Sequence, residues 1–239
     1  MAETLQDTAP ARTPLNRERV LRAAIALADE QGLAALTMRR LAGQLGVEAM
    51  SLYHHVPGKD RLLEGMLELV VDEMTVARPG GDWKAELRGS ALSAHEVLGR
   101  HPWAAGAMSA TARPIEARFR FMEGLLSTLR AAGLSPTQTD HAYHALDSHI
   151  TGFTLWLASM RLDEIDLDQM ARQVMRELPR TEYPGLIEHI EVHLAPRDPD
   201  DEGSFAFGLD LLLDGFERLL DGSPDREARS KKGKRKRRG

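Results

Sequence analysis

Residues 37–59 include several side chains that could contact both a chain of phosphate groups and the polar or apolar groups beside it. They are Thr37, Arg39, Arg40, Ala49, Met50, Ser51, Tyr53, His54, His55 and Lys59. The cations can reach phosphate oxygens or a guanine edge, and the hydroxyl and imidazole groups are short or rigid partners for phosphate oxygens. Ala49 and Met50 offer apolar groups of the kind that contact thymine methyls. The set therefore predicts contact with double-stranded DNA.

These side chains need a rigid support, and the spacing around them predicts two short helices joined by a tight turn. Thr37 is a good N-cap for a helix that reaches Leu45, and Gly46 can close that helix in the left-handed conformation. A second helix fits residues 48–55, and Ala42 and Gly46 are small enough to let the two backbones cross. The inward-facing apolar positions are Leu41, Leu45, Val47 and Leu52. The pattern favours a helix-turn-helix over an ordinary corner of a helical bundle.

The second helix of such a pair has the right diameter to enter the major groove. We expect its Ala49 and Met50, together with Arg39 from the first helix, to influence sequence choice. The residues expected to anchor phosphates are Tyr53, His55 and Lys59, the last at the start of a further helix whose first amides can also face an anion. Residues 37–63 carry a net charge of only +2, which a dimer would double.

Composition bounds the other possibilities. The 239 residues include no cysteine, which excludes disulfides, thiolate metal sites and a cysteine nucleophile. The net charge of −5 is uneven, because residues 1–60 sum to zero, residues 61–225 to −13 and residues 226–239 to +8. The basic tail is either a solvated end without a role or a source of salt-sensitive attraction to DNA. Without a secretory signal or about 18 consecutive apolar residues, we expect a cytoplasmic chain that does not enter a membrane.

Apolar residues recur three and four apart almost throughout, and strand signals are nearly absent, which predicts an all-α fold. The expected helices cover about 16–31, 37–45, 48–55, 59–77, 82–99, a short segment after Pro102, 114–132, 136–161, 167–177 and 203–221. Prolines 179, 184, 196 and 199 predict loops. The expected domains are a disordered lead-in over 1–14, an N-terminal three-helix DNA-binding domain over 15–60, a larger C-terminal helical domain over 61–222 and a disordered tail over 223–239.

Other chemistry finds little support in the residue spacing. His189 and His193 lie four apart, and His141 and His144 lie three apart, so each pair could present two imidazoles to zinc from one helical face. No clear third ligand accompanies either pair. A glycine-rich phosphate loop, a serine elbow and a carboxylate pair are all missing. We therefore expect no metal, no cofactor and no enzymatic activity.

Several runs resemble the tetracycline-repressor (TetR) family of bacterial regulators. The most specific is Leu52-Tyr53-His54-His55-Val56-Pro57-Gly58-Lys59, preceded by Leu36 to Ala42 and by Gly46-Val47. Looser similarity follows within 142–155 and 205–217. The resemblance implies a homodimer on a palindromic operator, joined by a four-helix bundle of helices 136–161 and 203–221. Their long apolar stripes, with Gly208 and Gly215 one heptad apart for close approach, agree with that arrangement.

The resemblance also implies a small effector, held in the larger domain, that moves helix 59–77 and releases the operator. Candidate lining residues are Met66, Val70, His95, Trp103, Met108, Met122, Leu126, His149, Phe153 and Trp156. Singly each is more commonly core, but together they predict an adaptable, largely apolar pocket. The run from Ser109 to Pro114 lacks the repressor's magnesium-binding histidine, so no magnesium–tetracycline chelate is expected. The alternatives are a larger domain that only dimerises or binds a protein partner, and a helical enzyme that happens to contain the corner.

Overall fold

The computed structural model describes residues 14–111, 113–161, 167–195 and 202–221, and their regular structure is entirely helical. This confirms the predicted all-α fold. The helices are α1 (Arg17–Gln31), a 3-10 turn η1 (Leu33–Ala35), α2 (Met38–Leu45), α3 (Ala49–Tyr53), α4 (Lys59–Asp72), α5 (Trp83–Arg100), α6 (Pro102–Ala110), α7 (Glu116–Ala132), α8 (Pro136–Arg161), α9 (Leu167–Glu177), α10 (Pro184–Leu194) and α11 (Gly203–Asp221). The predicted lead-in, except Pro14, and the predicted tail lie outside the described residues.

The chain divides into two compact units between Leu69 and Val70, inside α4, whereas the sequence placed the boundary at residue 60. The first part of α4 belongs with α1 because Gly65 lets the two helices approach closely. A Cβ at this position would lie 2.7 Å from a methyl carbon of Leu21. The N-terminal unit therefore consists of α1, η1, α2, α3 and the first part of α4.

Side-chain caps and glycine turns determine where the helices of the N-terminal unit begin and end. Asn16 Oδ1 accepts the amide of Arg19 at 2.8 Å, and Thr37 Oγ1 accepts the amide of Arg40 at 3.2 Å, so both predicted N-caps are present. Gly46 ends α2 with φ +67°, a conformation that costs glycine little. The fully buried side chains that hold the unit together include Val20, Leu21, Leu41 and Leu52.

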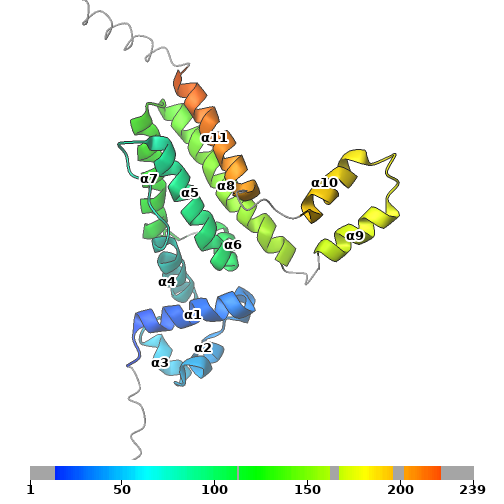
Figure 1. Cartoon of the computed structure of the whole chain (residues 1–239). Helices are drawn as coiled ribbons and strands as arrows, with labels where there is room; N and C mark the ends of the chain where they lie inside the picture. The colour runs from blue at the N-terminus through cyan, green and yellow to red at the C-terminus, as the bar shows by residue number, and fades with distance from the viewer. Residues whose placement is uncertain (1–13, 112, 162–166, 196–201, 222–239) are drawn as a thin grey trace, which may run out of the picture. The chain divides into compact units, whose positions relative to one another are not determined.

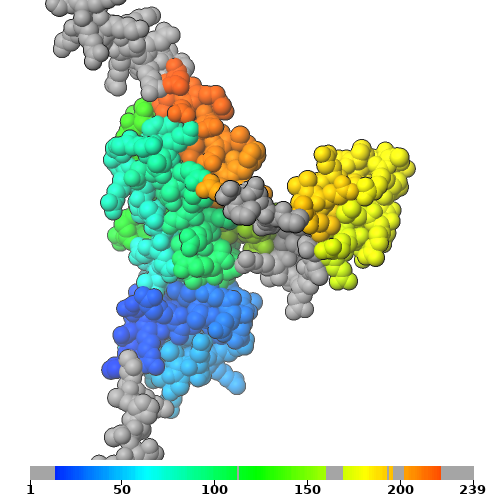
Figure 2. All heavy atoms as spheres, in the orientation of Figure 1, coloured from blue at the N-terminus to red at the C-terminus, as the bar shows by residue number. Residues whose placement is uncertain are grey.

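In the C-terminal unit α7 and α5 pack on α8, and α11 lies along α5 and α8, as the orange helix in Figures 1 and 2 shows. The core is aliphatic and includes Leu87, Leu98, Leu125, Leu129, Leu146, Leu209 and Leu213. Ion pairs also join α5 to α11. Lys84 Nζ lies 2.6 Å from Asp214 and 2.7 Å from Glu217, and Arg88 pairs with Asp210 at 2.8 Å. Because these pairs are solvent-accessible, burial contributes most of the stability.

The predicted helix 59–77 is too long, since α4 ends at Asp72. Tertiary contacts hold the following residues in a non-helical path. The Ser93 hydroxyl accepts the amide of Thr75 at 2.9 Å, and the Ser90 hydroxyl donates to the carbonyl of Thr75 at 2.7 Å. Gly124 of α7 makes room for this segment, because a Cβ there would lie 2.5 Å from Val76.

A second correction concerns the prolines, which predicted only loops over 179–199. Residues Pro184–Leu194 form α10, with proline at the first helical position, where no amide hydrogen is needed. α9 and α10 pack on each other. The predicted helix 48–55 is shortened to the five residues of α3. No helix in the described part of the chain is long and apolar enough to cross a membrane.

Candidate functional sites

The corner between α2 and α3 has the backbone geometry that the sequence predicts. The amide of Val47 donates to the carbonyl of Ala42 at 3.0 Å and the amide of Gly46 to that of Gly43 at 3.2 Å, which closes α2 in a Schellman-type turn. Leu41 and Leu52 are fully buried beneath the corner. Leu45 and Val47, also predicted to face inward, are half-buried. The helix-turn-helix is therefore held by one glycine turn and two buried leucines.

Most of the DNA-contact candidates lie on the outside of this corner. Met50 is 69% exposed and Tyr53 44% exposed, which leaves both side chains available to a partner. Thr37, Arg39, Arg40, His54 and Lys59 are also exposed, whereas Ala49, Ser51 and His55 are half-buried. The Arg40 guanidinium donates to the side-chain oxygen of Gln31, so it has an orientation set from α1. The Thr37 hydroxyl is occupied as the cap of α2.

Lys59 is the first residue of α4 and follows Gly58, whose φ of +119° turns the chain into the helix. Two residues on, Arg61 pairs with Glu64 at 2.8 Å, which neutralises part of its charge. The cation at the start of α4 that is best placed for a phosphate is therefore Lys59, whose charge adds to that of the helix N-terminus.

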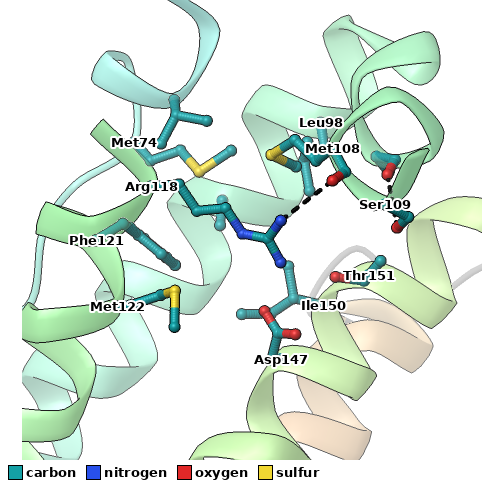
Figure 3. A pocket seen from close by; sticks show the side chains of 13 residues that line it. Met74, Leu98, Met108, Ser109, Arg118, Phe121, Met122, Asp147, Ile150 and Thr151 are labelled. Carbon is teal, nitrogen blue, oxygen red and sulfur yellow. Dashed lines mark hydrogen bonds between the residues drawn. The ribbon is translucent and has the colours of Figure 1, made fainter. Parts of the chain in front are cut away.

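A cavity of about 70 Å³ lies in the C-terminal unit among the end of α4, α5, α6, α7 and α8 (Figure 3). Its walls are Val71, Met74, Ala94, Leu98, Ala105, Met108, Ser109, Arg118, Phe121, Met122, Asp147, Ile150 and Thr151. Arg118 Nη1 donates to the carbonyl of Met108 at 3.2 Å. Figure 3 shows the carboxyl group of Asp147 and the hydroxyl group of Thr151 on the α8 side of the same cavity. The site combines one cation and one carboxylate with mostly apolar walls.

The predicted lining residues are divided among several environments. Met108 and Met122 line the cavity. Met66 and Val70 are fully buried core residues. Trp103 and Leu126 are half-buried outside the cavity wall, and Trp156 is 49% exposed on α8. His95, His149 and Phe153 belong to an aromatic cluster of the same unit.

Two polar members of the cavity, Arg118 and Asp147, were missed by reasoning that looked for apolar and aromatic residues. A periodic signal was present. Arg118 is followed by Phe121 and Met122, and Asp147 by Ile150 and Thr151, so each charged residue begins an i, i+3, i+4 set on one helical face. A charge at the start of an apolar helical face could have identified both walls.

The aromatic cluster joins α5, α8 and α11 through Phe205. The ring of His95 stacks on that of Phe205 with centroids 3.9 Å apart, and the ring of His149 stacks on it at 4.7 Å. His149 Nε2 also lies 2.9 Å from the carbonyl oxygen of Phe205. Gly208 leaves the space for this imidazole, because a Cβ there would lie 2.6 Å from His149 Cε1. Gly208 therefore serves packing within the chain.

Partial burial and the neighbouring His149 lower the pKa of His95 from its ordinary value of 6.5. In the unfolded chain His95 therefore binds its proton near pH 6.5, whereas in the folded chain it does so only at lower pH. The contribution of neutral His95 to the stability of the fold is complete above pH 6.5 and declines as the pH falls below that value. We expect His95→Phe, which retains a stacking ring, to lose less stability than the wild type between pH 7.5 and 5.5 in chemical denaturation.

The control for this comparison is His141→Phe, which replaces an exposed imidazole on α8. It should retain the wild-type loss of stability between the two pH values. An equal loss in His95→Phe and in the wild type would contradict the assignment of the effect to His95.

Within the described residues, no three His, Asp or Glu side chains are grouped so that they could hold a metal ion. The side chain of His193 is outside this description. His144 lies 3.6 Å from Asp140 on an exposed face of α8, as solvated helical pairs commonly do.

A helix-turn-helix with exposed donors, attached to a larger helical unit that contains a cavity, defines a DNA-binding regulator. The comparisons with known proteins agree with this class. The model for "Bacterial regulatory proteins, tetR family" matches residues 20–66, and that for "Tetracyclin repressor-like, C-terminal domain" matches residues 76–220. The chain therefore belongs to the TetR family of transcriptional regulators.

Individual relatives extend over most of the chain. The HTH-type transcriptional repressor DrrR1 of Streptomyces coeruleorubidus is 34% identical, over 91% of this chain and 85% of its own length. The class G tetracycline repressor protein of Vibrio anguillarum is 30% identical, over 87% of this chain and 96% of its own. Among solved structures, the TetR family protein ActR of Streptomyces coelicolor in complex with actinorhodin has a TM-score of 0.68 at 25% identity, covering 88% and 100% of the two chains.

Proposed function

We propose that this chain is a cytoplasmic, dimeric transcriptional repressor that leaves a palindromic operator when a small effector enters the cavity of its C-terminal unit. One observation carries the proposal. A single helix, α4, begins at the exposed Lys59 and contributes Val71 to the cavity wall, with Met74 just beyond its end. A change at the cavity can therefore reach the DNA-contacting unit through one continuous helix.

Relatives support both halves of the proposal. DrrR1 and the class G protein are repressors by name. ActR has been solved with actinorhodin and with (S)-DNPA, and a variant of TetR from Acinetobacter baumannii with minocycline. These complexes support our proposal that the corresponding unit here binds a small molecule.

The size of the cavity supports coupling between occupancy and helix movement. A volume of about 70 Å³ is too small for a drug-sized ligand, so binding must displace side chains or helices of the wall. The end of α4 is attached to that wall, because Asp72 pairs with Arg120 of α7 at 2.6 Å and Glu73 pairs with Arg100 of α5 at 2.9 Å. An effector that binds better to the displaced arrangement shifts the population away from the DNA-binding one.

An exposed apolar ridge on α11 supports dimerisation. We use apolar ridge for Phe207, Leu211, Gly215 and Leu219, which lie four residues apart on one face. Rows of this spacing interdigitate when two helices pack. Gly215 forms a gap in the ridge, since a Cβ there would meet only an Arg218 side-chain atom, at 4.0 Å. With the exposed Leu155 and Trp156 of α8, the ridge offers a surface for a second copy of the chain.

On DNA, we propose that Tyr53, His55 and Lys59 contact phosphates and that Arg39, Ala49 and Met50 select sequence. The five exposed candidates Thr37, Arg39, Arg40, His54 and Lys59 supply the polar edge of the surface, and Ser51 its half-buried hydroxyl. The hydrogen bond to Gln31 orients Arg40, which suits a contact with a phosphate of the DNA backbone.

Selection of binding sites from a pool of random duplex DNA by the purified chain tests the function. The expected product is an inverted repeat whose half-sites are about one helical turn apart, or a multiple of it. Absence of an enriched sequence, or enrichment of isolated half-sites, would overturn the proposal of a dimeric regulator on a palindrome. If a thermal-shift screen found no small molecule that binds, a larger unit that only dimerises or binds a protein would be favoured.

A further inference from the structure

The cavity in the C-terminal unit is unusual because its apolar wall contains one cation and one carboxylate. Among its lining residues these are Arg118 from α7 and Asp147 from α8, with the hydroxyl groups of Ser109 and Thr151 as the further polar side chains. Most of the remaining wall is aliphatic, thioether or aromatic. A ligand that fills this space must satisfy both charges or desolvate them without compensation.

Neither charge is neutralised by the other through direct contact. Arg118 donates to the Met108 carbonyl at 3.2 Å, which uses one of the five N–H donors of a guanidinium. Among the described residues, no ion pair of 4.0 Å or less joins Arg118 to Asp147, and both side chains are half-buried. In Figure 3 both groups face the cavity, with the guanidinium of Arg118 extending from α7 toward Asp147. The cavity thus retains free donors on one side and a free acceptor group on the other.

We infer that the effector is a flat, largely apolar aromatic acid that places its carboxylate on Arg118 and a hydroxyl group, on the same ring but not adjacent to the carboxylate, toward Asp147. This inference rests on the proposed function, in which the cavity holds the effector. A carboxylate matches the planar fork of a guanidinium, and such charge-assisted pairs are stronger than neutral ones. Asp147 would repel a second anion and instead accepts a hydrogen bond from a hydroxyl group.

The rest of the wall suits the aromatic part of such a molecule. Met74, Met108 and Met122 come from three different segments, and Phe121 lies beside Met122. Thioethers make favourable contacts with aromatic rings, and the unbranched side chain of methionine can change rotamer at low cost. Methionine rearrangement is therefore the least costly way to enlarge a cavity of about 70 Å³ for a bicyclic ring.

A matched set of three probes tests the inference by calorimetric titration of the full-length protein. The probes are 4-hydroxy-2-naphthoic acid, its methyl ester, which removes the charge, and 2-naphthoic acid, which removes the hydroxyl group. The hydroxy acid should bind at least about tenfold more tightly than the ester, the difference expected from one charge-assisted contact. In Arg118→Gln this preference should disappear, and in Asp147→Asn the preference over 2-naphthoic acid should shrink.

The control variant is Arg113→Gln, which removes the same charge at an exposed position outside the cavity wall and should keep the preference. Equal affinity for acid and ester in the wild type, an unchanged preference in Arg118→Gln, or no binding of any probe at millimolar concentration would overturn the inference. The proposed function fails separately, when no compound of a chemically varied library, charged or neutral, binds the protein or releases its operator.

Discussion

Replacing Leu211 with glutamate should convert the protein from dimer to monomer and lower its operator affinity by at least about a hundredfold. Leu211 lies in the middle of the apolar ridge and is 54% exposed in the single chain, so glutamate there should not disturb the fold of the monomer. At the interface of two copies, however, it would bury an unpaired charge. Linked binding of two half-sites commonly raises affinity 10²–10⁴-fold, and the monomer loses this gain. Light scattering coupled to chromatography measures the mass, and gel shift measures the affinity.

Phe119→Glu on α7 is a closely matched control, because Phe119 is also 54% exposed but lies outside the ridge. It should remain dimeric and bind the operator as the wild type does. A Leu211→Glu protein that stays dimeric at the concentration of the wild-type dimer would show that α11 does not form the interface.

The double substitution Tyr53→Ala with Lys59→Ala should weaken binding to all operator sequences alike, by at least about a hundredfold. Each half-site would lose one charge-assisted contact, worth about 1.5–3 kcal/mol, and one neutral hydrogen bond worth about 1 kcal/mol. Since both contacts are assigned to phosphates, base preference should not change. Loss of one lysine from each half-site should also reduce the slope of log K against log salt by about 2. Fluorescence anisotropy on several operators at several salt concentrations measures both effects.

Two single substitutions separate the contact classes. Arg61→Ala removes a cation two residues from Lys59 that is already paired with Glu64, and should have little effect. Met50→Ala should change the order of preference among operators more than the mean affinity. Full affinity of the Tyr53 and Lys59 double variant, or a change in its base preference, would contradict the phosphate assignment.

The helix-turn-helix could be predicted because its determinants are local. Thr37 caps α2, Gly46 supplies the left-handed turn and Leu52 fills the space below, all within sixteen residues of sequence. The end of α4 could not be predicted in this way. Met74 and Ala77 continue the apolar period of the helix and are indeed buried. The backbone of Thr75 between them donates to Ser93 and accepts from Ser90, which holds the chain in a non-helical path.

The residues that line the cavity were harder to predict from the sequence than the end of α4. Two of the ten predicted lining residues, Met108 and Met122, are on its wall. Apolar periodicity shows which face of a helix is turned inward, but whether a residue such as Met66 borders a void or a neighbour depends on how several helices meet. Gly208 illustrates the same limit, because its role toward His149 depends on a helix more than fifty residues away in sequence.

Residues 75–78 are held against the C-terminal unit, and this determines where a chimaera of this regulator with another can be joined. The division between the compact units falls between Leu69 and Val70, well before the two glycines of the run Arg78-Pro79-Gly80-Gly81. A chimaera cut at the glycines would transfer Val71 and Met74 with the DNA-binding unit and leave the effector cavity without part of its wall. Exchange of operator specificity between family members therefore requires a junction inside α4, before Val71, where the helix must continue unbroken across the joined sequences.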